Sequence, residues 1–134
     1  MLFLLSFYFG LGSFFSFVVA PELFKNLDRT TAGGIVEKVF PLYFGVGIGA
    51  VGVSLLIGIT SKMSRFLLLL IGINLLLLIA LEFYILPEAH SLKVASSPEF
   101  RKMHLISVIM STVSLFLTFG AVVYLIVKVK DAKA

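Results

Sequence analysis

The side chains of this sequence that could carry chemistry are two histidines and a few carboxylates near the ends of long apolar runs. Glu82 lies inside such a run, His90 follows three residues after Pro87, and His104 lies at the start of the last run. Ionisable groups at membrane depth are costly to bury and are functional candidates by default. Imidazole and carboxylate together suit Zn²⁺, Cu²⁺ or iron. Glu82, His90 and His104 are therefore the candidate metal ligands, and a metal cation is the candidate cofactor.

A second interpretation gives the same region a binding role without a metal. The side chains would then hold a proton or a small solute, and the candidate binding residues are Glu82, His104, Ser107, Ser111 and Glu22. A third interpretation treats them as solvated or capping residues of the membrane interface. The spacing between His90 and His104 is not a metal-ligand spacing, so the fold would have to assemble any site.

Signatures of enzymes are missing from the sequence. The glycines between residues 45 and 58 are not followed by Lys-Ser or Lys-Thr, and there is no Gly-x-Ser-x-Gly sequence. The chain has no cysteine, which excludes disulfides, iron–sulfur ligation and thiolate metal sites. We therefore expect a non-enzymatic protein, with a redox or haem-linked enzyme as the weaker alternative.

Four apolar runs must position these residues, and each is long enough to cross a bilayer. A spanning helix needs about 20 mainly apolar residues, and the chain is 60% hydrophobic and 13% charged. The runs cover residues 2–20, 42–59, 66–86 and 105–127. No Lys or Arg precedes Lys25, so the first run is expected to be a retained helix rather than a signal peptide. The prediction is an all-α, four-helix transmembrane bundle in a single integral membrane domain, residues 1–134.

The connections between the runs differ in length. The connection at residues 60–65 is a tight hairpin, whereas residues 21–40 and 87–104 are longer and lie together on the other side of the membrane. In the first long connection, Asp28 is expected to cap a short interfacial helix that runs to Phe40. In the second, Ser97-Pro98-Glu99 predicts the start of the last helix. Both histidines and six of the seven acids lie on or near this side.

Small and polar residues recur at helical spacing in three of the runs. Lipid provides no hydrophobic drive between helices, so close approach and hydrogen bonds must hold them together. The stripes are Gly12, Ser16 and Ala20; Gly45, Gly49 and Gly52; and His104, Ser107, Ser111, Ser114 and Thr118. We interpret them as packing surfaces. The alternative is that the last stripe lines a polar cavity.

The charge distribution indicates a membrane and no nucleic acid. The net charge is +4, but the basic residues lie at the ends of apolar runs and form no cluster suited to phosphate backbones. The short loop and the tail are densely basic, through Lys62, Arg65, Lys128, Lys130 and Lys133. The positive-inside rule then predicts cytoplasmic termini, in a membrane of the bacterial inner-membrane type.

Four helices are too few to enclose a transport path easily. We therefore expect either a homo-oligomer or a larger membrane complex around the chain. The leading hypothesis is a small membrane protein that binds or helps to move a small solute or metal cation. The alternative is a structural or accessory subunit with no chemistry of its own.

Two stretches resemble the signature of a known family. The first is Phe17-Val-Val-Ala-Pro-Glu-Leu-Phe24, then Leu27, Ala32-Gly33 and Phe40-Pro-Leu-Tyr-Phe44; the second is Phe100-Arg101, His104, Ser107 and Ser111. They resemble the transmembrane-protein-205-like family, also called the domain of unknown function 4149, with Ser111 where that pattern has Asn. The resemblance implies a four-helix membrane protein. It also implies a link to tolerance of metal-containing compounds in some members.

Overall fold

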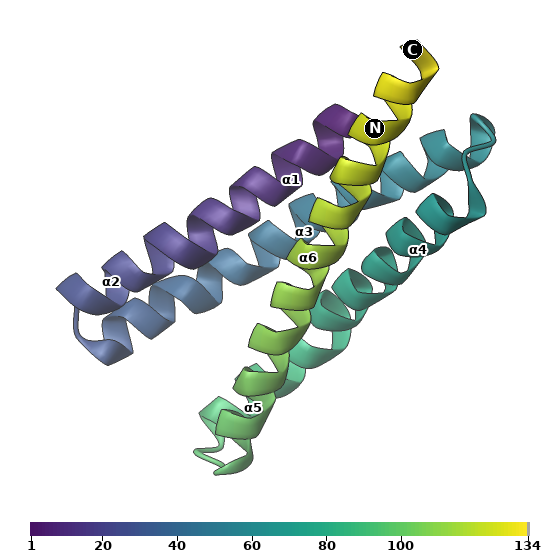
Figure 1. Cartoon of the computed structure of the whole chain (residues 1–134). Helices are drawn as coiled ribbons and strands as arrows, with labels where there is room; N and C mark the ends of the chain where they lie inside the picture. Colours follow the sequence, from purple (N-terminus) through teal and green to yellow (C-terminus); the bar gives the residue numbers. More distant parts are fainter. Residues whose placement is uncertain (134) are drawn as a thin grey trace.

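A computed structural model describes residues 1–133, without the side chains of Val94 and residues 129–133. The tail residues Lys130 and Lys133, which support the predicted orientation, therefore lie outside the described side chains. The described chain forms four long helices (Figure 1). They are α1 (Leu2–Phe14) with the π-helix η1 (Phe15–Val19) and α2 (Ala20–Asn26); α3 (Arg29–Thr60); α4 (Arg65–Ala80) with the π-helix η2 (Leu81–Ile85) and α5 (Leu86–Val94); and α6 (Glu99–Lys133).

The predicted four-helix transmembrane fold is confirmed. Each of the four helices is long and apolar enough to cross a membrane, so the chain is an integral membrane protein. Each predicted run lies within a helix that extends beyond it, mostly on the side of the long connections. The predicted start of the last helix is also confirmed, because the Ser97 hydroxyl accepts a hydrogen bond of 3.2 Å from the Glu99 amide.

The predicted interfacial helix between Asp28 and Phe40 is wrong as a separate element. Asp28 does cap a helix, accepting a bond of 3.1 Å from the Thr31 amide, but that helix is α3 itself, which continues to Thr60. Pro41 lies inside α3 and lacks the N–H that would bond to the Glu37 carbonyl. Pro41 is exposed on the helix surface, and α3 loses one backbone bond there and continues.

The two π-helical turns occur at equivalent places, each next to a proline. The Ala20 amide bonds to the Phe15 carbonyl, and the Leu86 amide bonds to the Leu81 carbonyl, which is the wide i to i+5 pattern. Pro21 and Pro87 follow directly. A proline ring clashes with the carbonyl four residues earlier and supplies no donor. Widening the helix by one residue relieves that clash, and such π-turns are common at functional sites.

The bundle consists of two similar helical hairpins. Contacts run around a ring, from α1 to α3, α3 to α4, α4 to α6 and α6 to α1. Phe17–Glu22 and Phe83–Glu88 share the pattern Phe-x-x-x-Pro-Glu. Buried residues of the first hairpin include Leu5, Tyr8, Phe15, Tyr43, Phe44, Gly47 and Ala50; their buried counterparts in the second are Ile71, Asn74, Leu81, Ser114, Leu115, Thr118 and Ala121. The constant offsets, 66 residues for the first helix of each hairpin and 71 for the second, indicate an internal repeat.

Candidate functional site

A fully buried hydrogen-bond network joins three helices halfway along the bundle. The Ser114 hydroxyl donates to the Asn74 Oδ1 at 2.5 Å, and Tyr8 Oη lies 2.9 Å from the same Ser114 oxygen. The Asn74 amide in turn donates to the Thr118 hydroxyl at 2.7 Å. Polar side chains inside a membrane hold helices together when they pair in this way. The network therefore supports the packing interpretation of the stripe along α6.

The rest of that stripe differs in exposure. Ser107 is buried, and its hydroxyl donates to the His104 carbonyl at 2.7 Å, whereas Ser111 is half-buried and bonds to the Val108 carbonyl at 3.3 Å. Both hydroxyls are satisfied within α6, an arrangement that costs little in a helix. Each oxygen keeps lone pairs that can accept a further bond or coordinate a cation.

Glu82 is the residue of the predicted site with an unusual environment. It lies in η2, half-buried, and its Oε2 is buried without a hydrogen-bond partner among the described residues. With a rise of about 1.5 Å per residue, it lies about 12 Å from Asn74 along the helix, towards the long connections. Since α4 and α6 are antiparallel and Asn74 bonds to Thr118, this is about the level of Ser107 and Ser111. An unpaired buried acceptor in a native structure calls for an explanation, such as a bound ion.

The predicted metal-ligand set is not assembled by the fold. In the part of the chain that the structure describes, no group of three or more His, Cys, Asp or Glu side chains is placed to hold a metal ion. The His104 side chain is exposed and stacks on Phe100 at 5.9 Å between ring centroids. His90 is engaged by Glu37 instead of by Glu82. The described part of a single chain therefore does not group His90, His104 and Glu82, and the metal site stays a prediction.

Glu22, the remaining candidate binding residue, makes a local contact. It is exposed on α2, and its Oε2 accepts a hydrogen bond of 3.1 Å from the Asn26 side chain one turn later. The side-chain amide of Asn26 also donates a hydrogen bond of 2.8 Å to the backbone carbonyl of Glu22. These bonds are typical of the end of a helix and give Glu22 no contact with Glu82 or His104.

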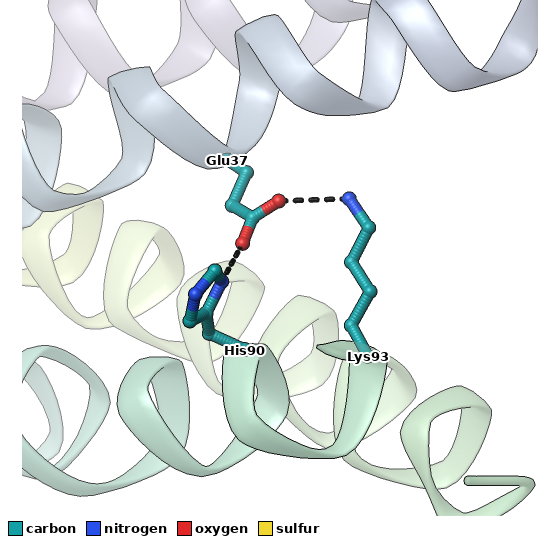
Figure 2. A network of polar contacts seen from close by, with 3 residues as sticks. All are labelled: Glu37, His90 and Lys93. Atoms are coloured by element: carbon teal, nitrogen blue, oxygen red, sulfur yellow. Dashed lines mark hydrogen bonds and ion pairs between the residues drawn. The ribbon is translucent and has the colours of Figure 1, made fainter. Parts of the chain in front are cut away.

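The role of Glu37 was not predicted from the sequence. This carboxylate of α3 hydrogen-bonds His90 through Oε1 and Lys93 through Oε2, the latter at 2.7 Å (Figure 2). The spacing of His90 and Lys93 places both on one face of α5, which is a signal the sequence carries. Their partner was hidden because residues 29–40 were interpreted as a helix lying on the membrane surface rather than as the first turns of α3.

Comparisons with known proteins give a family and a relative that this chain resembles. The sequence profile described as "Domain of unknown function (DUF4149)" matches residues 3–98, which covers the first three transmembrane helices. An "Uncharacterized protein" of Aquifex aeolicus (strain VF5) is 52% identical over 126 residues, 93% of each chain. No solved structure matches. The chain belongs to the family of the domain of unknown function 4149.

Proposed function

We propose that this protein is a non-enzymatic membrane protein that binds a small monovalent cation, the proton included, at Glu82. The observation that carries the proposal is the buried Oε2 of Glu82, which has no hydrogen-bond partner among the described residues. An ionised carboxylate held in this way at membrane depth is costly unless a positive charge meets it. The π-turn that contains Glu82 adds support, because such turns recur at functional sites.

A single positive charge fits the donor set better than a transition metal does. Structural and catalytic metal sites use three or four protein ligands, and Glu82 is not grouped with two further histidines or acids among the described residues. The negative charge of one carboxylate balances one positive charge, and hydroxyl oxygens supply neutral ligands. Ser107 and Ser111 stay the candidate neutral ligands, since they lie at the same level of α6.

Binding to the protein in lipid nanodiscs tests the proposal. Na⁺, K⁺ and methylammonium are titrated separately at constant ionic strength, and thermal unfolding is followed. A cation at 100 times its dissociation constant stabilises the folded state by about 2.7 kcal/mol. We expect Glu82→Gln to abolish the stabilisation by the effective cation. The matched control is Glu88→Gln, an exposed carboxylate beyond Pro87. Equal cation stabilisation of wild type and Glu82→Gln would contradict the proposal.

We also propose that both termini lie in the cytoplasm and that the chain resides in a bacterial-type inner membrane. Support comes from the short basic loop at Lys62 and Arg65. Because the chain has no cysteine, single cysteines at Ser61 and Ser96 report sidedness without background. An impermeant maleimide should label Ser96→Cys in intact cells and Ser61→Cys only after permeabilisation. The reverse pattern overturns the orientation.

A structural or accessory role in a homo-oligomer or larger complex is the second candidate function. It is favoured by Gly45 and Gly49, which face outward from α3, where an added Cβ would meet no heavy atom within 4 Å. Small residues four apart allow another helix to approach closely. Mass determination in nanodiscs distinguishes the candidates: an assembly that forms with wild type but not with Gly45→Leu, combined with no cation binding, would favour this second function.

A further inference from the structure

Polar groups join the two hairpins at two levels. The first level is the Tyr8–Ser114 bond in the middle of the membrane. The second is the pair of bonds from Glu37 of the first hairpin to His90 and Lys93 of the second. The other interhelical side-chain bonds among the described residues, at Asn74 and Ser64, stay within the second hairpin. Near the long connections, the described polar bonds between hairpins therefore all pass through one carboxylate.

The hairpin ends around this carboxylate are separated. In Figure 1 the turn between α2 and α3 lies well apart from the turn between α5 and α6. Within the described residues, α2 packs on η1 and α3, and α5 packs on η2 and α6, so each end is held mainly by its own hairpin. Apolar contacts that could hold the two ends together are thus few, and the Glu37 bonds span the separation (Figure 2).

Each end also has a built-in place to bend. η1 precedes α2 and η2 precedes α5, and both are π-turns beside a proline. Kinks in long helices concentrate at prolines and π-turns, where the regular hydrogen-bond ladder is already interrupted. Glu82 lies within the second of these turns. Any bending at η2 therefore moves the carboxylate of the proposed cation site.

We propose that Glu37, His90 and Lys93 form a latch that holds the two hairpin ends together and controls aqueous access to Glu82. This regulation of the Glu82 site rests on the proposed function, but the latch itself is a property of the two ends. With the latch closed, η2 stays packed against α3 and α6, and Glu82 Oε2 stays buried. With the latch open, the ends separate by bending at η1 and η2, and water and cations reach Glu82.

The latch is weak enough to open reversibly. The side chains are 63% exposed for His90, 42% for Lys93 and 35% for Glu37. Ion pairs this exposed change an equilibrium by less than about tenfold each, because water screens them. Two such contacts on one carboxylate leave closed and open states close in free energy. A weak, exposed pair at a hinged end is suited to switching, whereas the Tyr8–Ser114 bond is fully buried away from water.

The separation of the ends is measured directly by spin labels. Lys25 of α2 and Ser91 of α5 are exposed and are the label sites, and the cysteine-free background makes Lys25→Cys with Ser91→Cys clean. Distances are recorded by pulsed electron paramagnetic resonance in nanodiscs. We expect one dominant short distance, and Glu37→Gln to raise the population at longer distance by about two- to tenfold. Raising the salt to about 1 M should have the same effect without a mutation, since it screens exposed pairs.

Access to Glu82 is measured in the same samples by its amidation with a water-soluble carbodiimide and methylamine, quantified by mass spectrometry. Glu37→Gln should speed this reaction. The matched control for the latch is Glu88→Gln, which should change neither readout. Unchanged distances in both Glu37→Gln and high salt would overturn the latch. If the hairpin ends separate but neither the wild type nor any variant binds a cation, the proposed function is overturned and the latch is still supported.

Discussion

Tyr8 of α1 and Ser114 of α6 share a hydrogen bond of 2.9 Å where the two hairpins meet inside the membrane. The Ser114 hydroxyl donates to Asn74 Oδ1, so its oxygen accepts the Tyr8 proton. Tyr8 and Asn74 are equivalent positions of the internal repeat, and both converge on this one serine. A single hydroxyl thereby links the first helix of each hairpin.

Replacing Ser114 with alanine should destabilise the bundle, because Tyr8 and Asn74 each lose a buried partner. Interhelical bonds in membrane proteins contribute on average about 0.6 and at most about 1.7 kcal/mol, so two bonds give a loss of about 1–3 kcal/mol. Ser111→Ala is the matched control, since Ser111 bonds to a carbonyl of its own helix. Thermal unfolding in one detergent compares the two. Equal losses would show that the network does not hold the hairpins together.

Alanine at the inward-facing glycines should be far more damaging than alanine at the outward-facing ones. A Cβ at Gly47 would lie 2.7 Å from the fully buried Tyr8 ring, and one at Gly12 would collide with the Tyr43 hydroxyl. Overpacking of this kind destabilises by about 1–3 kcal/mol. A Cβ at Gly45 or Gly49 meets nothing within 4 Å.

The outward substitutions Gly45→Ala and Gly49→Ala should leave the unfolding temperature unchanged or raise it, because alanine is the better helix former by about 1 kcal/mol. Unfolding curves of the four single variants, measured side by side, check this ranking. A loss of stability in Gly45→Ala as large as that in Gly47→Ala would contradict the packing described for α3.

The cap of α3 should contribute a pH-dependent part of the stability. Hydrogen bonds from the Thr31 hydroxyl and the Thr31 amide lower the pKa of Asp28. Because the folded pKa lies below the unfolded value of about 3.9, the contribution is complete above that value. It is lost as the pH falls through the lower, folded pKa.

Asp28→Asn isolates this contribution, because asparagine caps a helix as well as aspartate does but does not titrate. The difference in unfolding temperature between wild type and Asp28→Asn should therefore be constant near neutral pH. Below about pH 4 the wild type should lose stability relative to Asp28→Asn. A difference that stays constant well below that pH would mean that the Asp28 charge does not support the cap.

The positions of the four helices could be predicted from the sequence because length and apolarity alone determine which runs cross a bilayer. Local caps were also within reach, since Asp28 and Ser97 act on amides two or three residues away. The predicted interfacial helix failed for a physical reason as well. A proline removes one backbone hydrogen bond, and at the exposed position of Pro41 inside the long helix α3 that loss does not end the helix.

Contacts between segments far apart in the chain could not be predicted from the sequence. Glu37 and His90 are far apart in the chain and lie on different hairpins, and no local pattern pairs them. The histidines and Glu82 are expected on one side of the membrane, but their side chains lie in different surroundings, which no local pattern shows. His104 stacks on Phe100, and Glu82 is held in a π-turn that a run of apolar residues does not reveal.

The internal repeat is hard to recognise in the sequence because the two halves differ in residue type. Its equivalent buried positions hold residues of different kind, such as Tyr8 with Asn74 and Gly47 with Thr118. At these buried positions, burial and register reveal the repeat and residue identity does not; the shared pattern Phe-x-x-x-Pro-Glu is the part of it that identity shows. The two halves of the repeat also differ where function is proposed, because Ser16 of η1 stands where η2 has Glu82. The carboxylate thus belongs to one hairpin, and the proposed site is an asymmetric feature of a symmetric scaffold.

Infrared spectroscopy of the Glu82 carboxyl reports directly on whether this group binds a cation. The protein is labelled with ¹³C-carboxyl glutamate, placed in nanodiscs, and compared before and after addition of the cation that stabilises the wild type. We predict that the cation converts a protonated-carboxyl band into a carboxylate band, and that this difference signal is absent in Glu82→Gln and retained in Glu88→Gln. The same difference signal in Glu82→Gln, or no signal in the wild type, would rule out binding of the added cation at Glu82.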